Sequence, residues 1–293
     1  MKKVWIAILG VAMLIIGVPG LASAGGTHSA KHPSYVPPAA ASPGHELALA
    51  HPAHPFQTRP LRGGAKFSTA ASYNWSGYAV YGDHFRYIRA TYSIPSINCS
   101  TSPDGSFASQ WAGFDGYTDR TVEQIGTYAQ CSGGTPAYYA FYEMYPNPSV
   151  ALTGVSPGDS VTVSVLYSSS TSKWTLKLTD ETARSGISQT LPCPSGSKCW
   201  NANAEIISEV PNGGPPAASL ADYGTVGFTH IGITDTSGRG YNIFSSHWKN
   251  DKIFEVDGSR NQMQAPSKLE GSESGAGGGY GNQAFTDTAL AAN

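Results

Sequence analysis

Charged residues are scarce in this sequence. They make up 13% of the 293 residues, against about a quarter in ordinary proteins, and the formal net charge is −2. Because there is no basic excess, we expect neither a nucleic acid nor an anionic membrane surface as a partner. The polar surface must instead come from uncharged side chains, which change little when carboxylates take up protons in acid.

Long apolar runs are absent except at the N-terminus. There, Met1-Lys2-Lys3 precedes an apolar run from Val4 to Val18, which is followed by Ala22-Ser23-Ala24. A basic start, an apolar core and small residues at the end are typical of a secretory signal peptide. The run is too short for a bilayer span, which needs about 20 residues. We therefore predict a signal peptide over residues 1–24 and a secreted, extracellular protein with no membrane segment in its mature form.

Residues 25–67 lack any periodicity and contain few large apolar side chains, but they are rich in Pro, Ala and His. Such a composition does not form a packed core, so we interpret the segment as a linker or a pro-segment. Five of the eight histidines lie here: His28, His32, His45, His51 and His54. Because the charge of histidine changes between about pH 5 and 8, our hypothesis is that the segment covers the functional site at neutral pH and leaves it in acid. An active secreted protein that still began near Gly25 would contradict it.

Amphipathic helices of convincing length are also absent. From Ser68 onward, short alternating or aromatic runs are separated by Gly, Pro, Ser and Asn. The runs are 74–80, 87–94, 107–114, 121–128, 137–145, 161–165, 173–179, 202–210 and 226–234. A period of two predicts strands, and many strands without βαβ alternation predict an antiparallel sandwich or barrel. We assign residues 68–293 to this all-β domain, with a loose Gly/Ser-rich stretch at 267–281 and a last strand or frayed tail at 285–290.

Cysteines are few, and their even number in an exported chain predicts disulfides. Three pairings of Cys99, Cys131, Cys193 and Cys199 are possible. We favour Cys193 with Cys199 because the residues between them form a tight loop, which leaves Cys99 with Cys131. The spacings that hold zinc, CxxC and HExxH, do not occur, so we predict no metal site.

The common catalytic motifs are missing as well. There is no G-x-S-x-G elbow, and the histidines beyond residue 67, which are His84, His230 and His247, are scattered. Imidazolium cannot act as a base in acid, so a hydrolase of an acidic medium must rely on carboxylates.

The candidate carboxylates lie in predicted strands. Glu205 and Glu209 share one face of a strand, whereas Glu123 and Gln124 are adjacent and point to opposite faces. Glu143 and Asp115 are further candidates. Spacing alone does not distinguish among them, because an acidic residue in such a run most often faces solvent.

Five short blocks resemble the glutamic peptidases, also called eqolisins. They are NWSGYA (74–79), WAGFDG (111–116), EQIG (123–126), YEMYP (142–146) and NAEIISE (203–209). They occur in the order of the family with similar gaps, and they cover residues 72–210. The resemblance is weakest beyond residue 235, so the fold of the last 50 or so residues is the least certain.

The resemblance implies two antiparallel sheets packed as a lectin-like, concanavalin A-like sandwich. It also implies an acid endopeptidase that acts on protein or peptide substrates with a Glu/Gln dyad and without metal or cofactor. The family's catalytic pair falls on Glu209 and Gln124. Trp75, Trp111, Asp115, Glu143 and Tyr145 fall near the cleft, with supporting or substrate-binding roles. The fungal relatives carry a cysteine where this chain has residues 117–120, so their disulfide pattern is not carried over.

Under this hypothesis, ionised Glu209 takes a proton from water and returns it to the leaving amine, while the amide of Gln124 stabilises the oxyanion. We expect a monomer. Two alternatives stay open: a glycoside hydrolase on a similar fold, which would use paired glutamates, and a non-catalytic carbohydrate-binding module.

Overall fold

The computed structural model describes residues 56–57, 68–210, 219–243, 245, 247–270 and 283–290. All of them belong to one compact unit, which spans Pro33–Asn293. The predicted signal peptide, nearly all of segment 25–67 and most of the Gly/Ser-rich stretch lie outside the described residues. Within the described ranges there are strands and turns but no helix. It follows that none of these residues forms a helix long and apolar enough to cross a membrane.

The all-β prediction is therefore confirmed for the described part of the chain. The strands are β1 (Phe56–Gln57), β2 (Ser68–Ser72), β3 (Trp75–Tyr81), β4 (Phe85–Ser93), β5 (Phe107–Phe114), β6 (Val122–Ser132), β7 (Thr135–Tyr145), β8 (Val150–Leu152), β9 (Ser160–Ser168), β10 (Lys173–Asp180), β11 (Ser185–Pro192), β12 (Asn203–Glu209), β13 (Thr225–Asp235), β14 (Gly240–Tyr241), β15 (Lys249–Val256), β16 (Gln262–Pro266) and β17 (Phe285–Ala289). The last of these settles the C-terminal alternative in favour of a strand.

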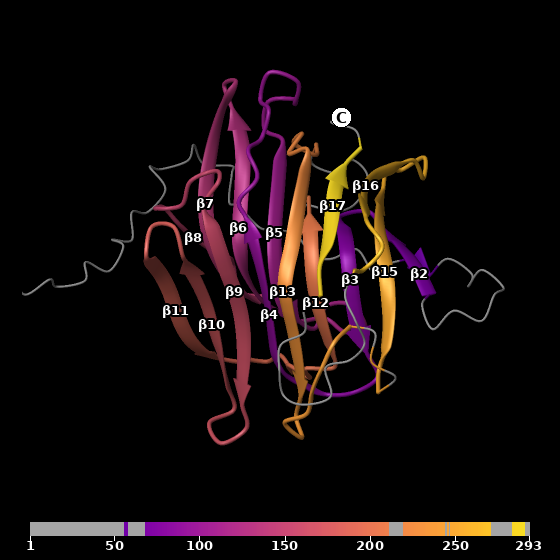
Figure 1. Ribbon diagram of the computed structural model, residues 1–293. Coiled ribbons are helices and arrows are strands. Elements are labelled where there is room, and N and C mark those ends of the chain that lie inside the picture. The colour runs from indigo at the N-terminus through magenta and orange to yellow at the C-terminus, as the bar shows by residue number, and fades with distance from the viewer. Residues whose placement is uncertain are drawn as a thin grey trace, which may run out of the picture. The chain divides into compact units, whose positions relative to one another are not determined.

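The strands pair in two series, which Figure 1 allows the reader to follow. The first series runs β2–β15–β3–β12–β5–β6–β7–β8. The second series runs β11–β10–β9–β4–β13. Every pairing in the two series is antiparallel except that of β2 with β15, which is parallel. The antiparallel prediction is thus confirmed with one exception.

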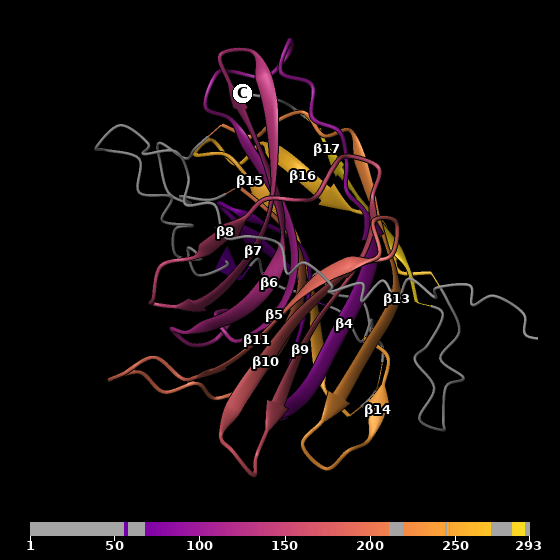
Figure 2. The same cartoon turned by 90° about the vertical axis from the view of Figure 1, so that its left-hand side faces the viewer.

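A pair of short strands joins the two series into one curled sheet. β16 pairs with β15 of the first series, β17 pairs with β16, and β13 of the second series pairs with β17. Figure 2 shows β16 and β17 bridging the two series at one end. The segment beyond residue 235, whose fold was the hardest to predict from the sequence, therefore connects the two series.

Apolar side chains cover both faces of β12. Ile206 belongs to a large core cluster that also contains Val163 of the second series and Ile125 of the first. Ile207 belongs to a smaller cluster on the other face, together with Trp111. Every residue of β12 is buried. The strand that carries Glu205 and Glu209 is thus enclosed by neighbours on both sides and by side chains on both faces.

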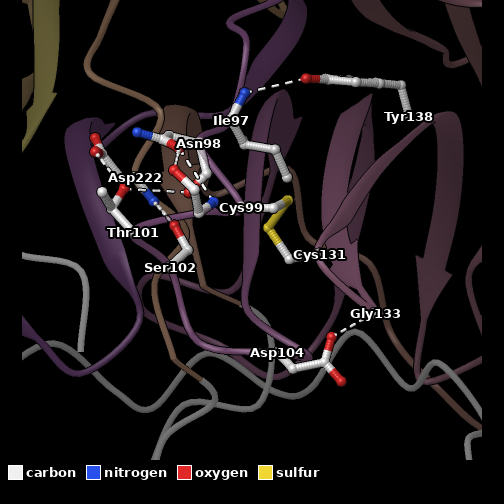
Figure 3. Close-up of a disulfide and its surroundings, with 11 residues drawn as sticks. Ile97, Asn98, Cys99, Thr101, Ser102, Asp104, Cys131, Gly133, Tyr138 and Asp222 are labelled. Atoms are coloured by element: carbon white, nitrogen blue, oxygen red, sulfur yellow. Dashed lines mark hydrogen bonds between the residues drawn. A yellow bond between two sulfur atoms is a disulfide. The ribbon is translucent and has the colours of Figure 1, made fainter.

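Both disulfides join the predicted partners. Cys99 is bonded to Cys131 and Cys193 to Cys199, so the predicted pairing is confirmed. Figure 3 shows that the first disulfide lies beside a group of polar contacts. In that group, Asp222 accepts a hydrogen bond from Thr101 at 3.2 Å, and its backbone N–H donates to Ser102 at 2.8 Å. These bonds fix the segment that leads into β5.

Candidate active site

The register of the first series places the predicted site residues on one face of the sheet. Glu209 lies opposite Trp75 on β3 and Ser109 on β5. Gln124 on β6 lies opposite Glu143 on β7. Directly opposite residues of antiparallel strands point to the same face. That face is the one covered by the smaller apolar cluster around Ile207 and Trp111.

Two neutral donors hold the carboxylate of Glu209. The Trp111 indole Nε1 donates to Oε2 at 2.7 Å, and the Asn74 amide Nδ2 donates to Oε1 at 3.0 Å. Trp75 packs edge-on against Trp111 with their ring centroids 5.1 Å apart. Burial raises the pKa of Glu209 to about 7, and the indoles of Trp111 and Trp75 and the Asn74 amide act against that rise. Glu209 is therefore a buried carboxyl whose proton is lost more readily because of its neighbours.

The amide of Gln124 is bonded to a second carboxyl. Its Nε2 donates to Glu143 Oε2 at 2.6 Å, while its own Oε1 has no hydrogen-bond partner. The pKa of Glu143 is raised well above its usual range by burial and then by the negative charge of Glu209, and it is lowered by the bond from Gln124. The field of Glu209 thus reaches the group that holds Gln124.

The indole of Trp111 lies between the two halves of the site, and two glycines make room for it. A Cβ on Gly126 would lie 2.6 Å from the Cβ of Trp111 and 2.1 Å from the carbonyl oxygen of Gln110. A Cβ on Gly113 would lie 3.1 Å from Trp111 Cζ3 and 3.1 Å from Gln124 Cβ. The indole therefore donates to Glu209, and its six-membered ring lies beside Gly113, the residue opposite Gln124.

Glu209 and Gln124 nevertheless make no hydrogen bond to each other. Their strands are separated by β5, and they are offset by four residues, since Gln124 lies opposite Gly113 and Gly113 lies opposite Glu205. Four residues correspond to about 13 Å along a strand. Glu205, rather than Glu209, is in the cross-strand row of Gln124. The structure thus brings together Glu209 with both tryptophans, and Gln124 with Glu143.

Glu205 lies in a very different environment. It belongs to a group of four acidic residues, which we call the acidic cluster: Asp115, Asp119, Glu123 and Glu205. Glu123 and Glu205 are 0% exposed, and none of their four carboxyl oxygens has a hydrogen-bond partner among the described residues. Burial, followed by the charges of the other cluster members, raises the pKa of both residues well above the usual range. The pKa of Asp119 is raised to about 7 by burial and by the charge of Asp115.

The expectation that these acidic residues face solvent is wrong. Glu143 and Glu209 are each 3% exposed, and Asp115 is fully buried like the two glutamates of the acidic cluster. The reason is that the two apolar clusters cover both faces of β5, β6 and β12. The described ranges contain no group of three or more His, Cys, Asp or Glu side chains arranged to hold a metal ion.

Asp115 acts in the structure as a backbone anchor. Its carboxylate accepts hydrogen bonds from the N–H groups of Trp200, Asn201 and Ala202 at 2.7, 2.8 and 2.7 Å. These three residues lead into β12, so Asp115 fixes the start of the strand that carries Glu209. Two roles were predicted for Asp115, supporting the site or binding the substrate, and this arrangement favours the supporting role. Tyr145, at the end of β7, packs half-buried against the smaller apolar cluster.

Asn74 is the residue that sequence reasoning missed. It stands directly before Trp75 in the first of the five blocks, where Asn74-Trp75-Ser76 also has the form of a glycosylation acceptor. In the structure Asn74 is 0% exposed and bonded to Glu209. The available signal was its position in a block next to a predicted site residue, but nothing in the residue type pointed to Glu209.

Comparison with known proteins yields one consistent family. The model of the peptidase A4 family matches residues 73–274. The chain is 30% identical over 186 residues to aspergillopepsin-2 of Aspergillus niger and 33% identical over 147 residues to scytalidopepsin B of Scytalidium lignicola. These alignments cover 56% and 50% of this chain, and they span only 64% and 54% of the relatives' lengths.

A solved structure of scytalido-glutamic peptidase, bound to a peptide-based transition-state analogue, has a similar fold. Its TM-score is 0.58 at 22% identity, and the superposition covers 74% of this chain and 98% of that one. The family match includes all the residues that surround Glu209 and Gln124. By sequence and by fold, the chain is a member of the peptidase A4 family, the eqolisins.

Proposed function

We propose that this chain is a secreted acid endopeptidase that uses Glu209 and Gln124 as its catalytic pair. The two paired series of strands would then correspond to the two layers of a lectin-like sandwich, with the site on the face that carries Trp111. The observation that carries the proposal is the setting of Glu209. It is a buried carboxylate held by two uncharged donors, and it lies within the electrostatic reach of the group bonded to Gln124.

Glu209 acts as the general base in this proposal, and then as the general acid. It removes a proton from a water molecule that attacks the scissile carbonyl, and it returns the proton to the leaving amine. Because the base must be ionised, activity falls on the acid side of the pH profile as Glu209 takes up a proton. The position of that fall reports the pKa of Glu209. Burial is the largest cause of the raised pKa of about 7. The hydrogen bonds from Trp111 and Asn74 act against that rise and favour the ionised form.

Gln124 stabilises the oxyanion. One N–H of its amide is bonded to Glu143, which leaves the second N–H of Nε2 available to a substrate oxygen. An amide suits an acidic medium because it does not titrate. Loss of an oxyanion donor of this kind reduces the rate by about 10² to 10³. The bond to Glu143 holds the amide in the orientation that this role requires.

The decisive experiment compares two glutamates of the same strand. We expect Glu209→Gln and Gln124→Ala to abolish cleavage of denatured globin at about pH 3 to 5, whereas Glu205→Gln, on the same face of β12, retains it. Circular dichroism would establish that each variant is folded. Near-normal proteolysis by a folded Glu209→Gln or Gln124→Ala variant would refute the pair, and loss of activity in Glu205→Gln alone would move the base to Glu205.

The same preparations decide between the classes of substrate. We expect the wild-type protein to cleave globin and to leave β-glucan intact, because the uncharged donors around Glu209 suit a single general base. Hydrolysis of the glucan without proteolysis would instead support the glycoside hydrolase alternative. Binding without cleavage of either substrate would support a non-catalytic module.

A further inference from the structure

Asn74 lies just before β3 and contacts the end of β12 through both its side chain and its backbone. Its Nδ2 donates to Glu209 Oε1 at 3.0 Å. Its backbone carbonyl accepts a hydrogen bond from the N–H of Val210 at 3.0 Å. The residue is fully buried. Two contacts to consecutive residues therefore hold Asn74 at a fixed place beside the Glu209 carboxylate.

Ser72 determines which end of the Asn74 amide faces Glu209. The Ser72 hydroxyl donates to Asn74 Oδ1 at 3.0 Å. The same hydroxyl oxygen accepts hydrogen bonds from the N–H groups of Asn74 and Trp75 at 3.3 and 3.2 Å. Because its acceptor side is occupied by backbone donors, the hydroxyl proton is directed to the amide oxygen. The amide nitrogen is then left to donate to Glu209.

Among the residues that the structure describes, the groups that favour the ionised form of Glu209 are uncharged, namely two indoles and the amide of Asn74. The charged groups that face Glu209 from the elements packed around it are Glu143 on β7 and Glu255 on β15, and the charge of Glu209 raises the pKa of each. A negative charge on Glu209 must therefore be stabilised by uncharged hydrogen-bond donors.

We propose that Asn74, oriented by Ser72, is a positioning residue that favours the ionised form of Glu209 and fixes the direction of its carboxylate. This inference rests on the role of Glu209 as the base in the proposed reaction. A donor to a carboxylate stabilises the ionised form over the protonated form. Trp111 supplies the corresponding donor to the other oxygen. A carboxylate has about four acceptor sites, so two donors leave capacity for a water molecule.

The test is the pH profile of kcat/KM for a peptide substrate in the wild type and in Asn74→Ala. We expect the acid limb to move up by about 1 to 2 pH units, which is the effect of one hydrogen bond to a charged group. Ser72→Ala should move the limb in the same direction by less. Asn98→Ala is the matched control, because Asn98 is an exposed asparagine bonded to Ser100. It should leave the limb in place.

A second readout does not depend on catalysis. Infrared difference spectroscopy during a pH titration, with Glu209→Gln to assign the band, measures the ionisation of Glu209 itself. An unchanged Glu209 titration in folded Asn74→Ala would overturn the positioning role, as would a change confined to KM. If Asn74→Ala does not fold, Asn74→Ser and Ser72→Ala carry the same test. Full activity of Glu209→Gln would refute the proposed function, whereas a shifted titration would still establish the contact.

Discussion

Glu123 and Glu205 should make the folded protein less stable as the pH rises from acid to neutral. Both are fully buried without hydrogen-bond partners, and burial raises the pKa of each well above the usual range. The groups that face them are acidic or uncharged: Asp115, Asp119 and Tyr117 from the turn, and Phe114 and Met144 from the adjacent strands. The basic residue of that turn, Arg120, is exposed.

The magnitude follows from proton counting. In the unfolded chain a glutamate ionises near its ordinary pKa of about 4.3, whereas in the folded chain these two remain protonated until their raised pKa is reached. Over the interval between, the folded state binds one more proton per glutamate. The free energy of unfolding therefore falls by about 1.4 kcal/mol per pH unit for each residue. Together the two residues lower it by about 2.7 kcal/mol for each pH unit over which both stay protonated in the folded chain, which is a large fraction of a typical folding stability of about 5 to 15 kcal/mol.

The assay is urea unfolding followed by tryptophan fluorescence at pH 5, 6 and 7. We expect Glu205→Gln to reduce the slope of unfolding free energy against pH by about 1.4 kcal/mol per unit, because glutamine is always uncharged. Glu181→Gln replaces an exposed glutamate and is the matched control, which should keep the wild-type slope. A wild-type slope in both Glu205→Gln and Glu123→Gln would refute the reasoning, because the two residues would then be ionised in the folded state.

Two further predictions concern packing and cross-links. Gly126→Ala would place a Cβ 2.1 Å from the carbonyl oxygen of Gln110. We therefore expect thermal unfolding to show that the free energy of unfolding falls by about 3 kcal/mol, together with reduced activity. In Gly227→Ala the nearest neighbour of the new Cβ would be 4.0 Å away, so this variant should lose far less stability. Urea unfolding should also distinguish the two disulfides. Removal of Cys99–Cys131, whose partners are 32 residues apart, should lower the free energy of unfolding by about 4 kcal/mol. Removal of Cys193–Cys199, whose partners are 6 residues apart, should lower it by about 2 kcal/mol. Equal losses for the two disulfides would contradict the loop-length argument.

The strands that the sequence predicted best are those rich in apolar residues. The run 107–114 coincides with β5, and the alternating valines of 161–165 lie within β9. β15 was missed because buried polar residues interrupt its pattern: Asn250, Asp251 and Glu255 are each 3% exposed or less. Their burial is compensated by partners from distant segments, such as the hydroxyl of Tyr117 on Asp251. A local period does not reveal such partners.

The same limit applied to the site. The five blocks identified the residues around Glu209, and the register confirms that Glu205 and Glu209 share one face, as their spacing predicted. Spacing could not say that one would be held by Asn74 and Trp111 while the other would lie unpartnered in the acidic cluster. Those differences are set by residues about 80 to 135 positions away in the chain.

Glu205 and Glu209 lie on the same strand and are both buried, but burial affects their ionisation to different extents. At Glu205 nothing offsets the cost of desolvation, so the neutral form is favoured and acid stabilises the fold. At Glu209 uncharged donors offset part of that cost, so its pKa rises only to about 7. An acid peptidase needs both properties, a fold that tolerates protonation and a base that can still lose its proton. Under the proposed function, the donors to Glu209 are thus what separates a reactive carboxyl from a structural one on β12.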